Sequence, residues 1–523
     1  MNRAKGIARL KSETSPWDVV IIGGGATGLG CALDAVSRGY RTVLLEQADF
    51  ANGTSSRSTK LIHGGVRYLR QGNVPLVRES LREREWLLKQ VPHQVRPQAF
   101  MIPTYSVLET WYYRIGLWFY DLLASRGGVQ STTRFNKARA LERVPTLKAE
   151  KLAGGVQYWD GQFDDARLCI QTAQTIWDKG GIALNHLKVD KLVTTNGRLS
   201  GVAVSDQLTG ETFAIKGRSF ILATGIFSDE LRQADNPDTP RIIRSSRGSH
   251  IVVDEAFLPA KTAVMVPKTT DGRLLFMVPW LGKVIIGTTD IDDENIQLDP
   301  EPSQDEVDFI IENAAPYLSK PISRSDIRSV YSGLRPLVQP GGVSGDTSKI
   351  SRNHFIDVSG TGLITVAGGK WTTFRKMGED AIEKAIEVGG LQERPTRSLT
   401  MRFHGFSDVE TTDADPFNAY GSDAIVLRGW IRDQPELGEK LHPRLAYVWA
   451  EVLFGIREEL AESVEDILTR RTRALFLDAQ AAMEVASAVA RFMAEERDLS
   501  KEWELSSIES FLSIAKSYIL AES

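Results

Sequence analysis

Three glycines near the N-terminus have the spacing of a phosphate-binding turn. Gly23, Gly25 and Gly28 form G-x-G-x-x-G, directly after an apolar run and at the start of a helical pattern. The first glycine permits a tight turn, the second lets the backbone approach a pyrophosphate, and the third lets helix and strand pack closely. Amides at the helix start can donate to phosphate oxygens. An empty structural turn is the alternative, but the complete context favours a bound dinucleotide.

An acidic residue at the end of the next apolar run narrows the choice of dinucleotide. Glu46 follows Gly28 by 18 residues, where a carboxylate can accept hydrogen bonds from the adenosine ribose hydroxyls. An acid at this position disfavours a 2′-phosphate, and therefore disfavours NADP. NAD and FAD remain to be distinguished.

A segment dense in Ser, Thr and Gly favours FAD. Residues 55–69 read SSRSTKLIHGGVRYL and come shortly after Glu46. Backbone amides and hydroxyls there can line a pyrophosphate and a flavin ring, which is more cofactor surface than a nicotinamide dinucleotide usually needs. A polar loop that caps a helix is the alternative. The residues of this region expected to contact the cofactor are Thr54, Ser55, Ser56, Ser58, Gly64 and Gly65.

Two later segments also place small residues where a flavin can lie. The segment FILATG ends a strand-like run with Ala223, Thr224 and Gly225. The segment VAGGKWTT begins a helical pattern with Gly368, Gly369, Lys370 and Thr372. At a helix start, the amides and the helix dipole can stabilise negative charge on a reduced flavin.

These motifs need a strand, helix, strand unit and a late return of the chain to position them. Residues 17–22 and 41–45 are apolar runs that predict buried strands, with a helical pattern between them. The sequence predicts an α/β fold: a Rossmann-like FAD-binding domain, a mixed β substrate domain and a C-terminal helical cap. The predicted ranges are 1–16 for a basic N-terminal arm, 17–95, 150–240 and 350–395 for the FAD-binding domain, 96–149 and 241–349 for the substrate domain, and 396–523 for the helical domain.

Composition is that of an ordinary globular protein. Of 523 residues, 42% are hydrophobic and 25% are charged, which is enough to build two or three cores. The net charge of -4 argues against general nucleic-acid affinity. Cys31 and Cys169 are the only cysteines, so we expect neither a disulfide framework nor a metal site, and a reducing compartment is favoured.

Two segments raise the question of lipid contact. No apolar run reaches the roughly 18 residues of a spanning helix, so we expect no membrane crossing. Residues 110–124, TWYYRIGLWFYDLLA, read either as a buried helix or as an interfacial face that dips into lipid. The N-terminal arm is expected to be solvated, or drawn to anionic lipid.

Taken together, the motifs resemble the FAD-dependent glycerol-3-phosphate dehydrogenases, flavoproteins of the glycine-oxidase and D-amino-acid-oxidase-like fold. The segments that carry the resemblance are IIGGGATGLGCALDAVSRG, TSSRSTKLIHGGVRYL, DDARL, RGSHIVV, IIGTTD, YSGLRPL and GGKWTTFRK, in family order. The resemblance implies oxidation of sn-glycerol 3-phosphate to dihydroxyacetone phosphate, with electrons passing through FAD to a membrane quinone. It also implies a surface-bound enzyme, which we expect on the cytoplasmic face of a bacterial inner membrane. A homodimer is one assembly that the sequence leaves open.

The same resemblance implies roles for individual residues. Arg67 and Tyr68 in HGGVRY are similar to family residues beside flavin and substrate, and His250 in RGSHIVV resembles a histidine near the reacting carbon. Arg335 in SGLRP resembles an arginine at the substrate hydroxyl. The cations that resemble the phosphate-binding pair are Arg352 and Lys370. The catalytic candidates are therefore His250, Arg335 and Arg67.

The chemistry explains why such residue types are needed. Oxidising a secondary alcohol requires a base within about 2.6 to 3.2 Å of the hydroxyl, and cations that anchor the phosphate. His250 is the best titratable base, since an unperturbed histidine has a pKa of about 6.5. Arg335 as the group that orients or polarises the hydroxyl is the competing account. For the cations, surface ion pairing is the alternative to phosphate binding.

The sequence departs from the family pattern at two places and leaves two other functions open. Ile226 and Phe227 stand where the family usually has Pro-Trp, and Phe374 stands where Tyr is common. Either departure could alter the site or mark another substrate. The rival functions are an oxidase that uses dioxygen and a flavin-binding sensor without turnover.

Overall fold

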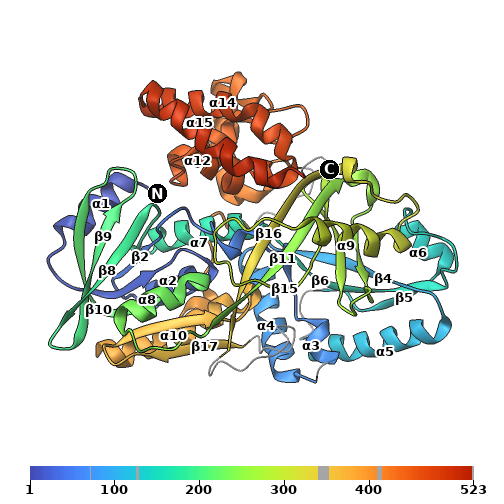
Figure 1. Ribbon diagram of the computed structural model, residues 1–523, viewed down its shortest axis with the longest axis horizontal. Helices are drawn as coiled ribbons and strands as arrows, with labels where there is room; N and C mark the ends of the chain where they lie inside the picture. The colour runs from blue at the N-terminus through green and yellow to red at the C-terminus, as the bar shows by residue number, and fades with distance from the viewer. Residues whose placement is uncertain (71, 125–128, 340–352, 409–414, 521–523) are drawn as a thin grey trace.

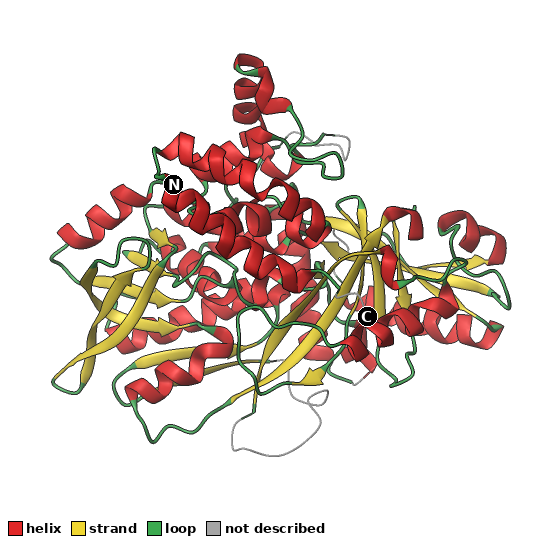
Figure 2. Cartoon of the chain, turned by 45° about the horizontal axis from the view of Figure 1, so that its top comes forward, coloured by secondary structure: helices red, strands yellow, loops and turns green. Residues whose placement is uncertain are grey.

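The computed structural model describes residues 1–70, 72–124, 129–339, 353–408 and 415–520. Within these ranges the strands form two sheets (Figure 1). Figure 2 shows the strands gathered in two groups, with helices between and above them.

The first sheet carries the glycine-rich turn. Its order is β17-β18-β10-β1-β2-β7, and β9 and β8 extend it from β10. The pairs around β1 are parallel, as is the pairing of β10 with β18, so the chain returns to this sheet late in the sequence. The strands are β1 (Trp17–Ile22), β2 (Thr42–Leu45), β7 (Ile182–Leu184), β8 (Leu187–Thr195), β9 (Arg198–Asp206), β10 (Thr212–Leu222), β17 (His354–Val358) and β18 (Leu363–Gly368).

The second sheet is mostly antiparallel. Its order is β15-β11-β14-β13-β12-β4-β6-β3, with β16 paired to β11 and β5 to β6. The long β11 and β16 pair in a register that sets His250 opposite Tyr331 and Ser246 opposite Arg335. The strands are β3 (Leu61–Ile62), β4 (Arg96–Thr104), β5 (Thr133–Asn136), β6 (Gly154–Gln162), β11 (Ile243–Asp254), β12 (Thr262–Val266), β13 (Leu275–Trp280), β14 (Lys283–Gly287), β15 (Ile291–Asp292) and β16 (Ile327–Val338).

The second sheet takes strands from ranges that the sequence assigned to the FAD-binding domain. Both β3 and β6 lie in those ranges, yet β6 pairs with β4 along its whole length. The reason is that an antiparallel partner for β4 can come from anywhere in the chain, and local pattern does not name it.

The helices cover the sheets and form a separate C-terminal group. In Figure 1, α12, α14 and α15 lie above the sheets, while α5 lies along the opposite edge of the molecule. The helices are α1 (Arg3–Ser12), α2 (Ala26–Ser37), α3 (Val66–Arg70), α4 (Val74–Gln90), α5 (Val107–Leu123), α6 (Lys137–Arg143), α7 (Asp165–Asp178), α8 (Ser228–Asp235), α9 (Gln304–Ala314), α10 (Phe374–Gly389), α11 (Ala424–Asp433), α12 (Trp449–Glu458), α13 (Ala474–Leu477), α14 (Ala479–Arg497) and α15 (Lys501–Ala515). In the described ranges no helix combines the length and the apolar composition needed to cross a bilayer.

The N-terminal arm contains a helix that is docked along one side and exposed along the other. Leu10 on α1 is buried, and the Arg3 guanidinium pairs with Asp206 at 3.0 Å. The sequence did not indicate this docking because both residues have partners that lie far along the chain.

Candidate active site

Two adjoining cavities contain most of the residues that the sequence singled out. The first cavity has a volume of about 470 Å³ and lies at the carboxyl ends of β1, β2 and β10. The second cavity, of about 320 Å³, lies against β11, β13 and β16 of the second sheet. Both are lined by the same five residues, Thr54, Pro336, Gly369, Lys370 and Trp371. A ligand in one cavity therefore meets a ligand in the other at this shared border.

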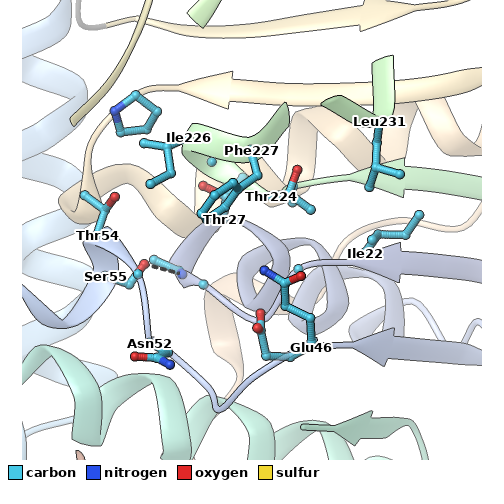
Figure 3. Close-up of a pocket in the computed structure, with 18 of the residues that line it drawn as sticks. Ile22, Thr27, Glu46, Asn52, Thr54, Ser55, Thr224, Ile226, Phe227 and Leu231 are labelled. Atoms are coloured by element: carbon cyan, nitrogen blue, oxygen red, sulfur yellow. Dashed lines mark hydrogen bonds between the residues drawn. The ribbon is translucent and has the colours of Figure 1, made fainter. Parts of the chain in front are cut away.

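The glycine-rich turn lies at one wall of the first cavity with no room for side chains. Gly23 has φ +110°, and a Cβ at Gly28 would overlap the carbonyl oxygen of Gly23. The first amides of α2 lie beside it, and the Ala26 amide donates to the Ser55 hydroxyl at 2.9 Å (Figure 3). A backbone that lies bare at a helix N-terminus is suited to a pyrophosphate.

Glu46 lines the first cavity at the end of β2. Its carboxylate accepts from the Gly24 amide at 2.6 Å and from the Ala48 amide at 2.9 Å. Burial raises the pKa of Glu46, while these two amides favour the charged form. The carboxylate is therefore held in place beside the cavity, as recognition of ribose hydroxyls requires. Together with the bare turn, this arrangement fits the adenosine and pyrophosphate of FAD.

The structure divides the predicted cofactor residues between the two cavities. Those that line the first are Gly23, Gly25, Glu46, Thr54, Ser55, Ala223, Thr224, Gly225, Gly368, Gly369 and Lys370. Those that line only the second are Ser58, Gly65 and Thr372. Gly28, Ser56 and Gly64 are absent from the described lining of both cavities.

His250 lines the second cavity from β11. Its ring stacks on Tyr331 with centroids 4.6 Å apart, and its Nε2 lies 2.9 Å from the Thr59 hydroxyl. Nδ1 is buried and has no hydrogen-bond partner among the described residues. Burial first, and then the charges of Lys60 and Arg335, hold the pKa of His250 well below its usual range. The imidazole is consequently neutral at neutral pH.

Arg335 reaches the second cavity from β16. Its Nη2 donates to the Thr288 hydroxyl and to the Thr289 carbonyl, both at 3.0 Å, and Nη1 lies 3.4 Å from Asp290. A Cβ at Gly248 would overlap the guanidinium. Polar partners in the connection between β14 and β15 thus hold Arg335 in place. Gly248 on the neighbouring strand β11 leaves room for its guanidinium.

Lys370 lies at the border between the cavities and contacts Tyr68, which lines the second. The Lys370 Nζ lies 3.9 Å from the centroid of the Tyr68 ring and 3.2 Å from the Ser80 hydroxyl. The Arg67 side chain and the whole of Arg352 lie outside the described residues. Of the predicted substrate set, the structure therefore brings together Tyr68, Arg335 and Lys370.

Several lining residues of the second cavity were not singled out from the sequence. Thr288, Thr289 and Asp290 belong to IIGTTD, which had served only as a mark of the family, and Trp371 belongs to GGKWTT. Their positions inside these two motifs were the sequence signal that could have identified them. The apolar wall had no such signal, because Phe100, Tyr158, Met265, Leu274 and Phe276 come from strands spread over the second sheet.

The departures from the family pattern lie away from the second cavity. Ile226 and Phe227 line the first cavity. Phe374 is buried and packs against Trp86 and Trp371. None of the three is in the described lining of the second cavity, so the departure at Ile226 and Phe227 bears on the first cavity, and Phe374 acts only through its neighbours.

Comparisons with known proteins agree with this arrangement. The family model for FAD dependent oxidoreductases matches residues 18–375, and the model for the C-terminal domain of alpha-glycerophosphate oxidase matches residues 366–504. The mitochondrial glycerol-3-phosphate dehydrogenase of Bos taurus is 39% identical over an alignment of 548 positions, which covers 98% of this chain and 75% of that protein.

Solved structures extend the likeness to three dimensions. Glycerol-3-phosphate dehydrogenase from Bacillus halodurans, complexed with FAD, superposes with a TM-score of 0.81 at 28% identity, covering 99% of this chain and 98% of that chain. Glycine oxidase from Geobacillus kaustophilus has a TM-score of 0.52 at 19% identity, over 73% of this chain and 96% of that chain. The predicted glycine-oxidase-like fold is confirmed.

Replacing Gly28 tests the bare turn of the first cavity. In the variant Gly28→Ala, the new Cβ overlaps the Gly23 carbonyl oxygen and must displace the turn from α2. We expect FAD to bind at least about ten-fold more weakly, which corresponds to roughly 1.4 kcal/mol. The measurement is the flavin content of purified protein and its titration with FAD. The control Gly429→Ala on α11 places a Cβ in open space, and full flavin content in both variants would contradict the assignment.

Proposed function

Because the chain belongs to the FAD-dependent oxidoreductases, and among them to the glycerol-3-phosphate dehydrogenases, we propose that it delivers the electrons from its substrate to a quinone at a membrane surface. Its cofactor is FAD, and its reaction is the oxidation of sn-glycerol 3-phosphate to dihydroxyacetone phosphate. The observation that carries the assignment of residues is the shared border of the two cavities, where Lys370 and Trp371 contact both.

Each residue in the second cavity has a task in this reaction. Bound FAD supplies a ring that accepts a hydride from the substrate carbon. Lys370 and Arg335 anchor the anionic substrate, and Arg335 also polarises its hydroxyl. His250 takes the hydroxyl proton.

The apolar wall of the second cavity keeps water away from these charges. It consists of Phe100, Tyr158, Met265, Leu274 and Phe276, which line the same cavity as the cations. Charge interactions are stronger where water is excluded. Intact cations beside an intact base favour turnover over the alternative of a flavin-binding sensor.

Removing the Lys370 charge tests phosphate binding. In Lys370→Met the phosphate loses a charge-assisted hydrogen bond, worth about 1.5 to 3 kcal/mol, so KM for glycerol 3-phosphate should rise about 10-fold to 100-fold. Turnover of unphosphorylated glycerol should change little. Steady-state kinetics with both substrates measure this difference. The matched control is Lys384→Met on the exposed side of α10, where Lys384 pairs with Glu387; equal kinetics in the two variants would refute the phosphate site.

The lowered pKa of His250 predicts a pH dependence. A base acts in its neutral form, and burial with Lys60 and Arg335 keeps His250 neutral below its ordinary pKa of about 6.5. The rate of flavin reduction at saturating glycerol 3-phosphate should therefore stay level from neutral pH down past about 6.5, and fall only at lower pH. Stopped-flow measurement gives the profile. His250→Asn should react slowly and lose this acidic limb, whereas an unchanged limb would assign the base elsewhere.

Support for a lipid contact comes from α5. Its outer face is apolar and exposed: Leu108 is 84% exposed and Leu122 is 59% exposed. The other exposed apolar residues of this face are Val107, Trp111, Tyr112, Ile115, Trp118 and Phe119. The buried-helix interpretation of this segment was therefore wrong for its outer half. A stripe of this kind is unusual on a protein that meets only water.

A cation contacts this apolar face, and two more follow it closely in the chain. The Arg134 guanidinium lies 5.2 Å from the Trp111 ring, and Lys137 and Arg139 are exposed on the neighbouring segment. Trp and Tyr favour the headgroup level of a bilayer, and cations favour anionic headgroups. We propose that α5 lies in the interface of a membrane, on the cytoplasmic side of a bacterial inner membrane, where a quinone is available.

Electron transfer to quinone is tested with a variant of the lipid-facing surface. The double variant Trp118→Ser, Leu122→Ser removes apolar contact area, so anaerobic turnover with quinone held in anionic vesicles should fall about ten-fold. Flavin reduction by glycerol 3-phosphate should be unchanged. The control is Leu208→Ser, which removes an exposed apolar residue of the β9–β10 turn. Stoichiometric peroxide in air, with no response to quinone, would favour the oxidase.

A further inference from the structure

Asp160 is a buried acid in the lining of the second cavity that the reaction does not use. It is on β6, and its carboxylate accepts from the Tyr120 hydroxyl at 2.9 and 3.0 Å, from the Gly64 amide at 3.3 Å, and from the Arg84 guanidinium. Asp160, Arg84 and Tyr120 are each at most 3% exposed. Its oxygens are occupied by protein donors, so it does not need a substrate group to satisfy them.

The donors to Asp160 come from three elements with different tasks. Gly64 precedes α3 in the turn that leads to Tyr68, beside Lys370. Arg84 belongs to α4, which also presents Ser80 to the Lys370 ammonium. Tyr120 belongs to the inner face of α5, the helix whose outer face carries the exposed apolar residues. One carboxylate thus joins the lipid-facing helix to the turn beside the substrate.

Tyr120 and Gly64 both donate to Asp160, and they are also in close steric contact with each other. A Cβ at Gly64 would overlap the Tyr120 hydroxyl and the Leu81 side chain, so α4 and α5 both press on this turn. Burial, and then the charge of Asp160, raise the pKa of Tyr120 well above its usual range. The hydroxyl therefore remains protonated and donates to the carboxylate at every working pH.

We propose that Asp160 is a positioning residue: its hydrogen bonds with Gly64, Arg84 and Tyr120 hold the turn that leads from Gly64 into α3, the helix that carries Tyr68. The turn then stays where Tyr68 and Lys370 meet the substrate. This inference rests on the substrate site proposed above.

Removing one oxygen atom tests the link. Tyr120→Phe keeps the ring and deletes only the donor to Asp160, so KM for glycerol 3-phosphate in solution should rise about five-fold, while kcat and flavin content stay nearly constant. The matched control is Tyr317→Phe, which deletes a hydroxyl from a ring that packs against Tyr105 and is outside the described lining of both cavities.

A second variant separates positioning from general loss of structure. Asp160→Asn keeps the shape but weakens all three hydrogen bonds, so KM should rise further than in Tyr120→Phe, again with flavin bound. If either variant loses thermal stability while KM is unchanged, the positioning role is overturned. If the unchanged enzyme does not reduce its flavin with glycerol 3-phosphate, the proposed function fails, and this outcome is distinct from variants whose KM equals that of an active unchanged enzyme.

Discussion

The ion pair between Lys60 and Asp165 fixes the segment that both cavities share. The two groups lie 2.8 Å apart with no exposed surface, and the Lys60 ammonium also donates to the Ser56 carbonyl at 2.6 Å. Burial lowers the pKa of Lys60 to about 7, against the opposing charge of Asp165. Such a pair repays its desolvation only when every polar atom has a partner. Here the ammonium also lies 5.0 to 5.4 Å from the ring centroids of Trp280, Tyr331 and Phe476.

The residues that precede Lys60 contact both the second sheet and helix α2. Thr59 contacts His250, the Thr54 hydroxyl donates to the Leu334 carbonyl at 2.5 Å, and Ser55 accepts from the first turn of α2. His250 and the glycine-rich turn are therefore positioned by one short segment. Arg473 of the C-terminal helices donates to the Ser56 carbonyl at 2.8 Å and lies 3.3 Å from Asp165. The helical domain thus contributes to the geometry of a site that it does not line.

The sequence predicted the parts of this site that depend on neighbours in the chain. The turn at Gly23, with Glu46 at the end of the next strand, follows from local pattern, because strand, helix and strand are consecutive. The contacts of Asp160 with Gly64 and Tyr120 join residues that are 96 and 40 positions away. No period or spacing reports such pairs, which form only when β6 is placed beside β4. For the same reason, the sequence pattern could not predict that β3 and β6 belong to the second sheet.

Composition alone does not decide whether α5 is buried or exposed. Its sequence is apolar around most of the helix, so the pattern fits a buried helix and an interfacial helix equally well. The difference arises from its partners. Leu117 and Tyr113 pack into the same hydrophobic cluster as Phe100, Tyr158 and Met265, which form the apolar wall of the second cavity. Because one cluster contains both, the inner face of α5 supports that wall, while its outer face is exposed. The exposed apolar face and the face that supports the cavity wall are therefore two sides of one helix, and a displacement of the helix would change the support of that wall.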